Sequence, residues 1–236
     1  MPLLHIRSFS NDQFILDKVF YANFYRIKSF QKSESPPTIL DIGAHCGYFS
    51  FAAIALGAKK VYAFEPFSEN YKMLLKNLSD DLFHTKLGVE VIPYQMGIYT
   101  INARLTFGYP ELQRGSFFDF AEIGEHANIA NTKVAASPSI TLDNALENYI
   151  GESIDILKIS IGYAEIPILL ASQLITTKVA HICGESSIDA SNQSKFELAM
   201  AQKGFPFCSY YDVPENEGKV LFHFSKTKLE DAFESK

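Results

Sequence analysis

The chain lacks several features that would place it in a specialised class of protein. Its three cysteines, Cys46, Cys183 and Cys208, include no Cys-x-x-Cys pair and no histidine spacing that is typical of a zinc site. An odd number of cysteines also offers no disulfide framework. We therefore expect a reducing compartment and no metal site.

Long apolar runs and basic clusters are also missing. No stretch of about 18 apolar residues occurs, and no basic segment leads into an apolar run at the N-terminus. The longest basic run is Lys59-Lys60, and the formal net charge is -6. Nucleic acid is not an expected partner, because binding to phosphates needs clustered positive charge. These absences predict a soluble, cytoplasmic protein without a membrane span.

A chain of 236 residues, 47% of them hydrophobic, is long enough to bury one core. Segments that resemble strands alternate with segments of helical periodicity. The expected strands are 38–42, 60–64, 89–94, 154–161, 179–184, 205–211 and 219–224, and the expected helices are 48–56, a helix capped by Ser68, 165–174 and 195–203. The last two strands suit an antiparallel hairpin. The pattern predicts an α/β fold, a doubly wound and mostly parallel sheet of about seven strands that ends in this hairpin.

An aromatic segment precedes this alternation. Residues 12–30 have roughly helical recurrence of apolar side chains, and residues 33–37 break it. We therefore expect a helical preface over residues 1–37 and a Rossmann-like domain over residues 38–236. Three roles are open to the preface: packing on the edge of the sheet, a lid over a ligand, or the contact surface of a homodimer.

Four local patterns make finer predictions. Alternation from 96 to 107 predicts a hairpin, and residues 108–131 predict a long irregular loop of the kind that often carries function. Asp143 is expected to cap the helix that follows it. Ser194, with Glu197 three residues later, has the pattern of a capping box.

The segment 39–50 is the most informative part of the chain. It passes from apolar strand residues through Asp41 into a turn that contains Gly43 and Gly47, and then into a helix. Such a turn brings backbone N–H groups and a helix N-terminus close to a ligand. The next strand leads to Glu65, 22 residues after Gly43. An acidic residue there suits the ribose of a nucleoside cofactor.

The glycine spacing helps to choose the cofactor. A nicotinamide-dependent oxidoreductase shares the expected fold, but its fingerprint is Gly-x-Gly-x-x-Gly, whereas Gly43 and Gly47 are separated by three residues. The spacing behind Asp41 suits S-adenosylmethionine, whose amino acid end Asp41 can meet and whose two ribose hydroxyls Glu65 can bind bidentately. The residues expected to bind this cofactor are Asp41, Gly43, Ala44, His45, Gly47, Tyr48, Phe49, Glu65, Pro66 and Met96.

Three segments resemble the FkbM-type methyltransferases, S-adenosylmethionine-dependent enzymes usually associated with O-methylation of sugars and natural products. Residues 41–50 (DIGAHCGYFS) and 64–66 (FEP) are similar to the family's D-x-G-A-N-x-G-x-x-S and F-E-P. Residues 141–146 (TLDNAL) resemble its T-L-D-D-x-x before a helix. The resemblance covers roughly residues 38–185 and implies a Rossmann-like class I methyltransferase fold.

The third segment departs from the family pattern. Residues 155–165 (DILKISIGYAE) are similar to the family's D-x-L-K-I-D-x-E-G-A-E, with Ser160 in place of Asp, Gly162 in place of Glu and Tyr163 in place of Gly. The resemblance implies that this strand end faces the transferable methyl group. Two carboxylates are therefore missing where an acid could hold a metal ion, orient a hydroxyl or accept its proton.

The catalytic residue is left unassigned, with His45, Ser160 and Glu165 as candidates. His45 stands where the family has Asn, and an imidazole there could exchange a hydrogen bond with the cofactor or act as a base. Glu165 could equally complement the dipole of the helix that it begins. Lys158, within an apolar strand, is expected to snorkel or to pair with Asp155.

Residues 114–117 (RGSF) resemble a Gly-x-Ser segment that family members place near the active site. With the aromatic side chains around it, this loop would make a rim for a sugar ring, and Arg114 would bind an anion. Folding of the same aromatic side chains onto the protein core explains the pattern equally well.

These patterns favour an S-adenosylmethionine-dependent O-methyltransferase that acts on a hydroxyl group of a sugar or secondary metabolite. A small molecule or glycan is then the expected acceptor. The changes at residues 160, 162 and 163 keep a second interpretation open, in which a degenerate methyltransferase fold binds the cofactor, or a partner, without methyl transfer.

Overall fold

The computed structural model describes residues 4–8, 10–20, 25, 35–78, 88–110, 120–123, 132–162, 164–212 and 219–228. Residues 21–24 and 26–30 of the predicted N-terminal helix lie outside these ranges, as do 111–119 and 124–131 of the predicted loop, with its RGSF segment, and Tyr163. Among the described residues, no helix has the length and apolar character needed to cross a membrane.

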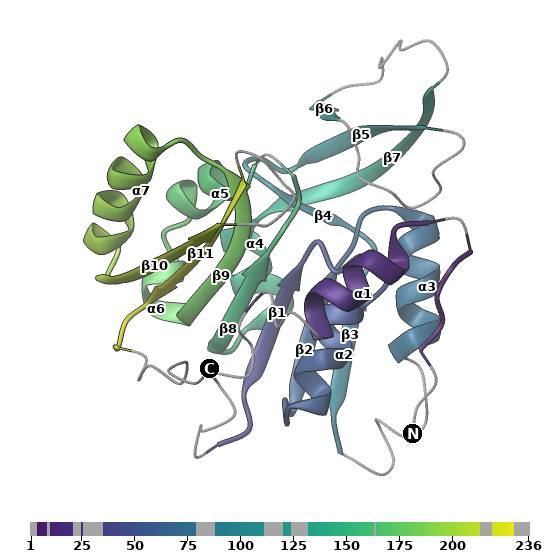
Figure 1. Cartoon of the computed structure of the whole chain (residues 1–236), viewed down its shortest axis with the longest axis horizontal. Coiled ribbons are helices and arrows are strands. Elements are labelled where there is room, and N and C mark those ends of the chain that lie inside the picture. Colours follow the sequence, from purple (N-terminus) through teal and green to yellow (C-terminus); the bar gives the residue numbers. More distant parts are fainter. Residues whose placement is uncertain are drawn as a thin grey trace.

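Seven strands form the main sheet (Figure 1). They are β1 (Thr38–Ile42), β2 (Lys60–Phe64), β3 (Glu90–Tyr94), β8 (Ile154–Ile159), β9 (Val179–Ser187), β10 (Phe207–Asp212) and β11 (Lys219–Ser225). Their order is β10-β11-β9-β8-β1-β2-β3, in which only β11 makes antiparallel pairs, with β9 and β10. The predicted doubly wound sheet with a C-terminal hairpin is confirmed, and β1 and β2 have the predicted bounds.

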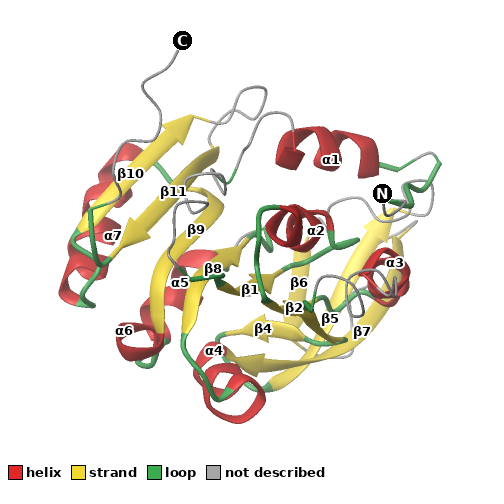
Figure 2. Cartoon of the chain, turned by 90° about the horizontal axis from the view of Figure 1, so that it is seen from below, coloured by secondary structure: helices red, strands yellow, loops and turns green. Residues whose placement is uncertain are grey.

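Helices cover both faces of this sheet (Figure 2). One face carries α1 (Asp12–Phe20), α2 (Tyr48–Ala55) and α3 (Ser68–Leu78), and the other carries α4 (Leu142–Asn144), the π-helix Ala145–Ile150, α5 (Glu165–Ala171), α6 (Ile175–Lys178) and α7 (Ala190–Gln202). Because side chains of a strand alternate between faces, Ile39 of β1 joins the first apolar cluster, and Leu40 and Ile42 join the second. β1 is therefore buried on both sides, as central strands of a parallel sheet are.

The N-terminal helix α1 packs on α2 and not on the edge of the sheet. The rings of Phe20 and Phe51 lie 5.8 Å apart, and Val19 is buried in the same apolar cluster as α2. In Figure 1 this helix lies across the N-terminal part of α2, near the carboxyl end of β1. The other two roles, a lid over a ligand and the contact surface of a homodimer, stay predictions.

A second, smaller sheet was not predicted. It contains β4 (Gly97–Tyr99), β5 (Ala103–Pro110), β6 (Phe120–Ile123) and β7 (Thr132–Thr141), in the order β4-β7-β5-β6. The predicted hairpin over 96–107 is wrong, because β4 and β5 both pair with β7: Ser139 is opposite Gly97 on one side and Ala103 on the other. Alternation indicates strands, but it does not identify their partners. Parts of the predicted loop 108–131 are strands of this sheet.

Two of the three predicted helix caps, Ser194 and Asp143, are also wrong. Asp189, and not Ser194, caps α7, since its carboxylate accepts a hydrogen bond from the backbone N–H of Asn192 at 3.0 Å. Ser194 lies inside the helix. Thr141, and not Asp143, caps α4. A Ser-x-x-Glu pattern also occurs inside helices, so the pattern alone does not identify a helix start.

Asp143 has a different role. Its carboxylate accepts hydrogen bonds from the Ser172 hydroxyl and from the backbone N–H groups of Gln173 and Leu174, both at 3.0 Å. The burial of Asp143 opposes its ionisation, but these hydrogen bonds prevail and lower its pKa. Asp143 therefore holds the turn between α5 and α6.

The corrected cap of α7 can be tested with two matched substitutions. Replacing Asp189 by Ala removes the side chain that accepts the backbone N–H of Asn192 at the start of the helix. We therefore expect the midpoint of thermal unfolding to fall by about 2 °C. Replacing Ser194 by Ala leaves the midpoint unchanged or raises it slightly, because Ala favours a helix interior. Calorimetry of both variants measures these midpoints. A larger decrease for Ser194→Ala than for Asp189→Ala would indicate that Ser194 caps the helix after all.

Candidate functional site

A pocket of about 250 Å³ lies at the carboxyl ends of β1, β2 and β8. This is the edge at which open α/β sheets bind ligands. Helix α1 contributes Phe14 and Lys18 to its wall, and the second sheet contributes Tyr99 and Leu105. The predicted site residues that line it are Gly43, Ala44, His45, Tyr48, Phe49, Glu65, Pro66, Ser160 and Glu165. Three others, Asp41, Gly47 and Met96, do not line it.

The turn after β1 needs glycine for two reasons. Gly43 has φ = +74°, and a Cβ atom on it would lie 2.1 Å from the carbonyl oxygen of Ser160. On the other side, the N–H groups of Gly43 and Ala44 both donate to the carbonyl oxygen of Phe64 at 3.0 Å. The turn is thus fixed between the ends of β8 and β2, which places its backbone in the pocket wall.

Gly47 and Met96 have packing roles. Gly47 has φ = +83°, and a Cβ atom there would lie 3.2 Å from Cδ1 of Leu78 in α3, so this glycine lets α2 and α3 approach each other. Met96 packs against the second apolar cluster. The residues that follow it, Gly97 and Tyr99, line the pocket in its place.

Asp41 lies beneath the turn. Its side chain is fully buried, its Oδ2 accepts a hydrogen bond from the Ser50 hydroxyl at 2.7 Å, and its Oδ1 lies 3.0 Å from Nζ of Lys158. The predicted pairing of Lys158 with Asp155 is wrong, because the Asp155 carboxylate accepts the backbone N–H of Thr38 instead. Asp41 therefore reaches the pocket only through Lys158.

Lys158 fixes the glycine turn from below. Its ammonium group donates to the carbonyl oxygens of Gly43 at 2.7 Å and Ile42 at 3.3 Å, in addition to its pairing with Asp41. An ammonium has three N–H donors, and these three partners use them all. The rings of Tyr25 and Phe49 lie 5.5 and 5.8 Å from the same nitrogen. Lys158 is thus a structural cation.

Glu65 is the carboxylate that enters the pocket from β2. It is 4% exposed, and it accepts hydrogen bonds from the backbone N–H groups of His45 at 2.8 Å and Phe67 at 3.0 Å, and from Nδ2 of Asn70 at 3.3 Å. Burial raises the pKa of Glu65, although these donors oppose the shift. A carboxylate accepts about four hydrogen bonds. Three are in use, so room remains for about one ligand donor unless Asn70 moves.

His45 adopts a left-handed conformation, with φ = +54°. Asn and His tolerate this region better than most residues, which explains why His can stand where the family pattern has Asn. The conformation turns the N–H of His45 toward Glu65. Its Nε2 lies 3.3 Å from Nη2 of Arg7, and because a guanidinium only donates, Nε2 is the acceptor. In this arrangement Nε2 is not aimed at a substrate.

The N-terminal segment reaches the pocket through Arg7. This guanidinium binds both oxygens of Asp12, from Nε at 2.9 Å and from Nη2 at 2.6 Å, and its Nη1 donates to Oδ1 of Asn70 at 2.8 Å. Asp12 is fully buried. Burial alone would raise the pKa of Asp12, but the hydrogen bonds and charge of Arg7 lower it to about 2. No local pattern predicts the contact between Arg7 and Asn70, since these residues are far apart in the sequence.

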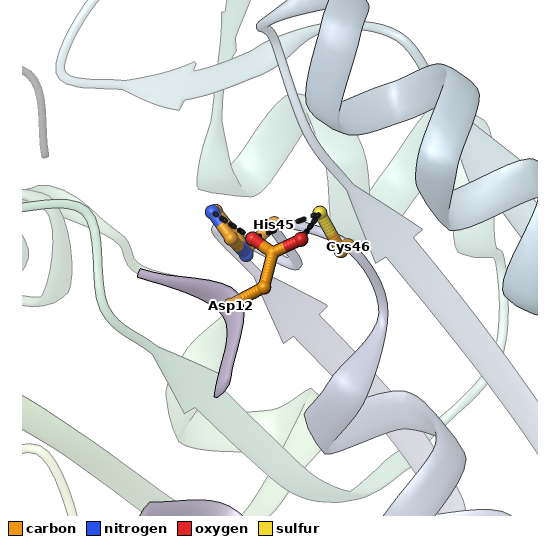
Figure 3. Close-up of side chains that lie close together, drawn as sticks. All are labelled: Asp12, His45 and Cys46. Atoms are coloured by element: carbon orange, nitrogen blue, oxygen red, sulfur yellow. Dashed lines mark hydrogen bonds and ion pairs between the residues drawn. The ribbon is translucent and has the colours of Figure 1, made fainter. Parts of the chain in front are cut away.

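Asp12, His45 and Cys46 form the group of described side chains that has the geometry of a metal site (Figure 3). Their ligand atoms lie within 4.8 Å of one another. In Figure 3 the carboxylate of Asp12 lies between the imidazole and the thiol. The chemistry does not suit a metal ion, because Arg7 binds both carboxylate oxygens. Burial also raises the pKa of Cys46 far above its usual value, which disfavours the thiolate that a metal needs.

The altered end of β8 is held by Glu165. Its Oε1 accepts the backbone N–H groups of Ile161 and Gly162, both at 2.7 Å, and its Oε2 accepts the Ser186 hydroxyl at 3.4 Å. Glu165 is fully buried, and this burial raises its pKa. Glu165 therefore shapes the loop after β8. Ser160 lines the pocket, and its side chain is hydrogen-bonded to that of Tyr25. The sequence did not predict this hydrogen bond.

An ion cluster in the pocket wall was missed from the sequence. Glu185 of β9 lies 2.7 Å from Lys18 of α1 and 3.4 Å from Lys219 of β11, and all three line the pocket. The available signal was an acidic residue near the carboxyl end of a parallel strand. It was missed because the strand was expected to end at Gly184, whereas β9 continues to Ser187.

Comparisons with known proteins agree with this geometry. The sequence profile described as methyltransferase FkbM domain matches residues 41–206. Among solved structures, methyltransferase FkbM from Methylobacillus flagellatus KT is 13% identical, with a TM-score of 0.53 over 94% of this chain and 56% of that one. The N-terminal domain of human METTL16 in complex with SAH is 10% identical, with a TM-score of 0.50 over 88% and 69%. These structures share the fold. No curated protein matches the chain significantly.

The close contact at Gly43 predicts an unequal response to two glycine substitutions. Gly151 has a similar φ of +71° but open space around it, so Gly151→Ala is expected to cost only the strain of a left-handed residue, about 1 kcal/mol. Gly43→Ala adds a clash with the Ser160 carbonyl and is expected to cost about 3 kcal/mol or more. Urea unfolding measures both, and equal costs would contradict the proposed fit.

The lowered pKa of Asp12 predicts how pH changes stability. A carboxylate with a pKa of about 2 in the folded protein and 3.8 outside it stabilises the fold above about pH 4, and this contribution is lost as the pH falls toward 2. The difference in unfolding free energy between wild type and Asp12→Asn should therefore shrink by about 1 kcal/mol from pH 6 to pH 3. Chemical unfolding at both values tests this; a constant difference would contradict it.

Proposed function

We propose, from the premise that this chain belongs to the methyltransferase FkbM family, that it transfers the methyl group of S-adenosylmethionine to a hydroxyl group of a small molecule or glycan. One observation carries the proposal. The Glu65 carboxylate and the Gly43 turn border the same pocket, at the carboxyl edge of a sheet with class I methyltransferase order. Membership of the family supports methyl transfer in general. The class of acceptor, a hydroxyl group of a small molecule or glycan, is our addition.

The residues present suit S-adenosylmethionine. Glu65 would accept hydrogen bonds from the ribose, with the amide of Asn70 beside it, and the apolar walls of Pro66 and Ile98 suit an adenine ring. The bound cofactor supplies a methyl group on a positively charged sulfur, ready for attack by an oxygen. The pocket contains no Gly-x-Gly-x-x-Gly turn, which a pyrophosphate would need. The solved neighbour METTL16 is described with SAH, which agrees with this reading.

At the acceptor end, this chain would use side chains from three segments. Tyr25 and Ser160 offer hydroxyl groups that can orient an acceptor oxygen, and burial raises the pKa of Tyr25 well above its usual value, so that it remains a donor. The acceptor must lose its proton as the carbon–oxygen bond forms. Glu185 is the carboxylate in this wall that is held by side chains and not by backbone N–H groups, and we propose it as the proton acceptor.

The net charge of -6 supports a small acceptor over a nucleic acid, and the absence of basic clusters in the sequence agrees. We further propose that the protein acts in the cytoplasm, since its buried free cysteines, Cys46 and Cys183, suit a reducing compartment.

A second function is favoured by one specific observation. Ser160 and Gly162 carry no carboxylate, and Glu165 is engaged by the backbone of its own loop. A protein with this arrangement could bind the cofactor without transferring its methyl group. The two functions share the cofactor pocket and differ at the acceptor end.

Calorimetry and a transfer assay separate these functions. We expect the wild type to bind S-adenosylhomocysteine and to pass labelled methyl groups from S-adenosylmethionine to members of a panel of sugars and hydroxylated metabolites. Glu65→Gln should weaken binding at least about tenfold, because one oxygen acceptor is lost. Glu152→Gln, the same change at a carboxylate that binds Tyr62 and Lys60 away from the pocket, is the control.

Glu185→Gln then examines the acceptor end. If Glu185 accepts the proton, this variant should lower kcat about a hundredfold and leave the affinity for S-adenosylhomocysteine unchanged. Cofactor binding without transfer to any hydroxyl acceptor would favour the second function. Saturable binding of NAD with none of S-adenosylhomocysteine would refute both.

A further inference from the structure

A residue that precedes the family domain contacts the wall of the cofactor pocket, because Arg7 binds Asn70. We propose that Arg7 is a positioning residue, which fixes the Glu65 carboxylate through the amide of Asn70 and so makes the segment 5–12 part of the cofactor site. The matched domain begins at residue 41. This inference rests on the proposed function, because it assigns the role of Glu65 in binding ribose.

A short chain of hydrogen bonds carries the inference. Nη1 of Arg7 donates to Oδ1 of Asn70 at 2.8 Å, and Nδ2 of Asn70 lies 3.3 Å from Oε1 of Glu65. Asn70 and Glu65 are 2% and 4% exposed, and both line the pocket. Arg7 thus lies two hydrogen bonds away from the carboxylate that faces a ligand.

The direction of the Asn70 amide is fixed from both ends, because Arg7 only donates and the Glu65 carboxylate only accepts. An amide can present either its oxygen or its NH2 group to a neighbour, and the two ends have nearly the same shape. A guanidinium only donates, so Arg7 requires the oxygen, and the NH2 group must then point to Glu65. Without Arg7 the amide oxygen loses its anchor, so the Asn70 side chain can leave the position in which its NH2 group meets Glu65.

Charge is not the means by which Arg7 acts on Glu65. Asp12 binds the guanidinium with both oxygens and is fully buried beside it, so the two charges cancel locally. The remaining property of Arg7 is geometric, because its planar fork binds Asp12 and Asn70 at the same time. A lysine has a single ammonium group and cannot reproduce that fork.

The segment is held in place independently of Arg7. The backbone N–H of His5 donates to Oδ1 of Asn77 at 2.7 Å, and Nδ2 of Asn77 donates back to the carbonyl oxygen of His5 at 3.2 Å. The Tyr48 hydroxyl donates to the same carbonyl at 3.3 Å. A substitution of Arg7 therefore leaves these contacts, and the effect on Glu65 can be measured in a docked segment.

The experiment compares two ligands on the full-length chain. Calorimetry measures the affinity for S-adenosylhomocysteine and for its 2′,3′-dideoxy analogue, which lacks the ribose hydroxyls. We expect the wild type to prefer the hydroxylated ligand at least about tenfold, because hydrogen bonds to a carboxylate are strong. Arg7→Gln should lower affinity for S-adenosylhomocysteine about tenfold, leave that for the analogue within about twofold, and so remove the preference.

Three further variants sharpen the result. Arg7→Lys keeps the charge and loses the fork, so it should behave as Arg7→Gln does. Asn70→Ser removes the amide between Arg7 and Glu65, while the ion pair of Arg7 and Asp12 remains. It should also remove the preference for the hydroxylated ligand, and it replaces Arg7→Gln as the test if that variant does not fold. Lys60→Gln, which breaks an ion pair with Glu90 away from the pocket, is the matched control and should change neither affinity.

The outcomes are distinct. Loss of the preference in Arg7→Gln, Arg7→Lys and Asn70→Ser supports the inference. Equal losses for both ligands would show a general structural role, and full affinity in Arg7→Lys would show that charge acts alone; either result overturns the inference and leaves the proposed function standing. A wild type that binds neither ligand overturns both.

Discussion

The buried ion pair of Lys158 and Asp41 is the constraint on which the site depends. It joins the two central strands at the edge where the ligand binds, with side chains that are 5% and 0% exposed. A charge at this depth is stable only with a partner, and losing one partner leaves the other uncompensated. Because the same ammonium binds the carbonyl oxygens of Ile42 and Gly43, the pair also fixes the path of the turn. The position of Glu65 follows, since His45 in that turn donates to it.

The sequence was sufficient to predict the elements that depend on apolar periodicity and on the positions of glycine. β1, β2 and the C-terminal hairpin follow from apolar runs and turn residues, and the family resemblance is confirmed by the match over residues 41–206. It was insufficient to predict which strands pair and which side chains contact each other. Three features join residues that are far apart in the sequence, where no spacing rule applies: the pairing of β4 with β7, the pairing of Lys158 with Asp41, and the hydrogen bond from Arg7 to Asn70.

The carboxylates that line the pocket near the altered end of β8 come from other elements than this strand. Ser160 removes a carboxylate from β8, and Glu165 holds the loop after it. The carboxylate of Glu185 comes from β9 and is bound by lysines of α1 and β11. This ion cluster therefore depends on three elements, of which α1 and β11 both lie outside the matched domain.

The order of the strands has a consequence for synthesis of the chain. Among the strands of the described residues, β11 is made after β9 and β10, yet it lies between them. Until residues 219–225 have left the ribosome, the edge of β9 has no neighbour and presents unpaired backbone groups to other chains. Lys219, the ion partner of Glu185, arrives with the same strand. Pairing of β11 with β9 therefore covers the exposed strand edge and completes the ion cluster of the pocket wall at the same time. A chain that lacks β11 has neither.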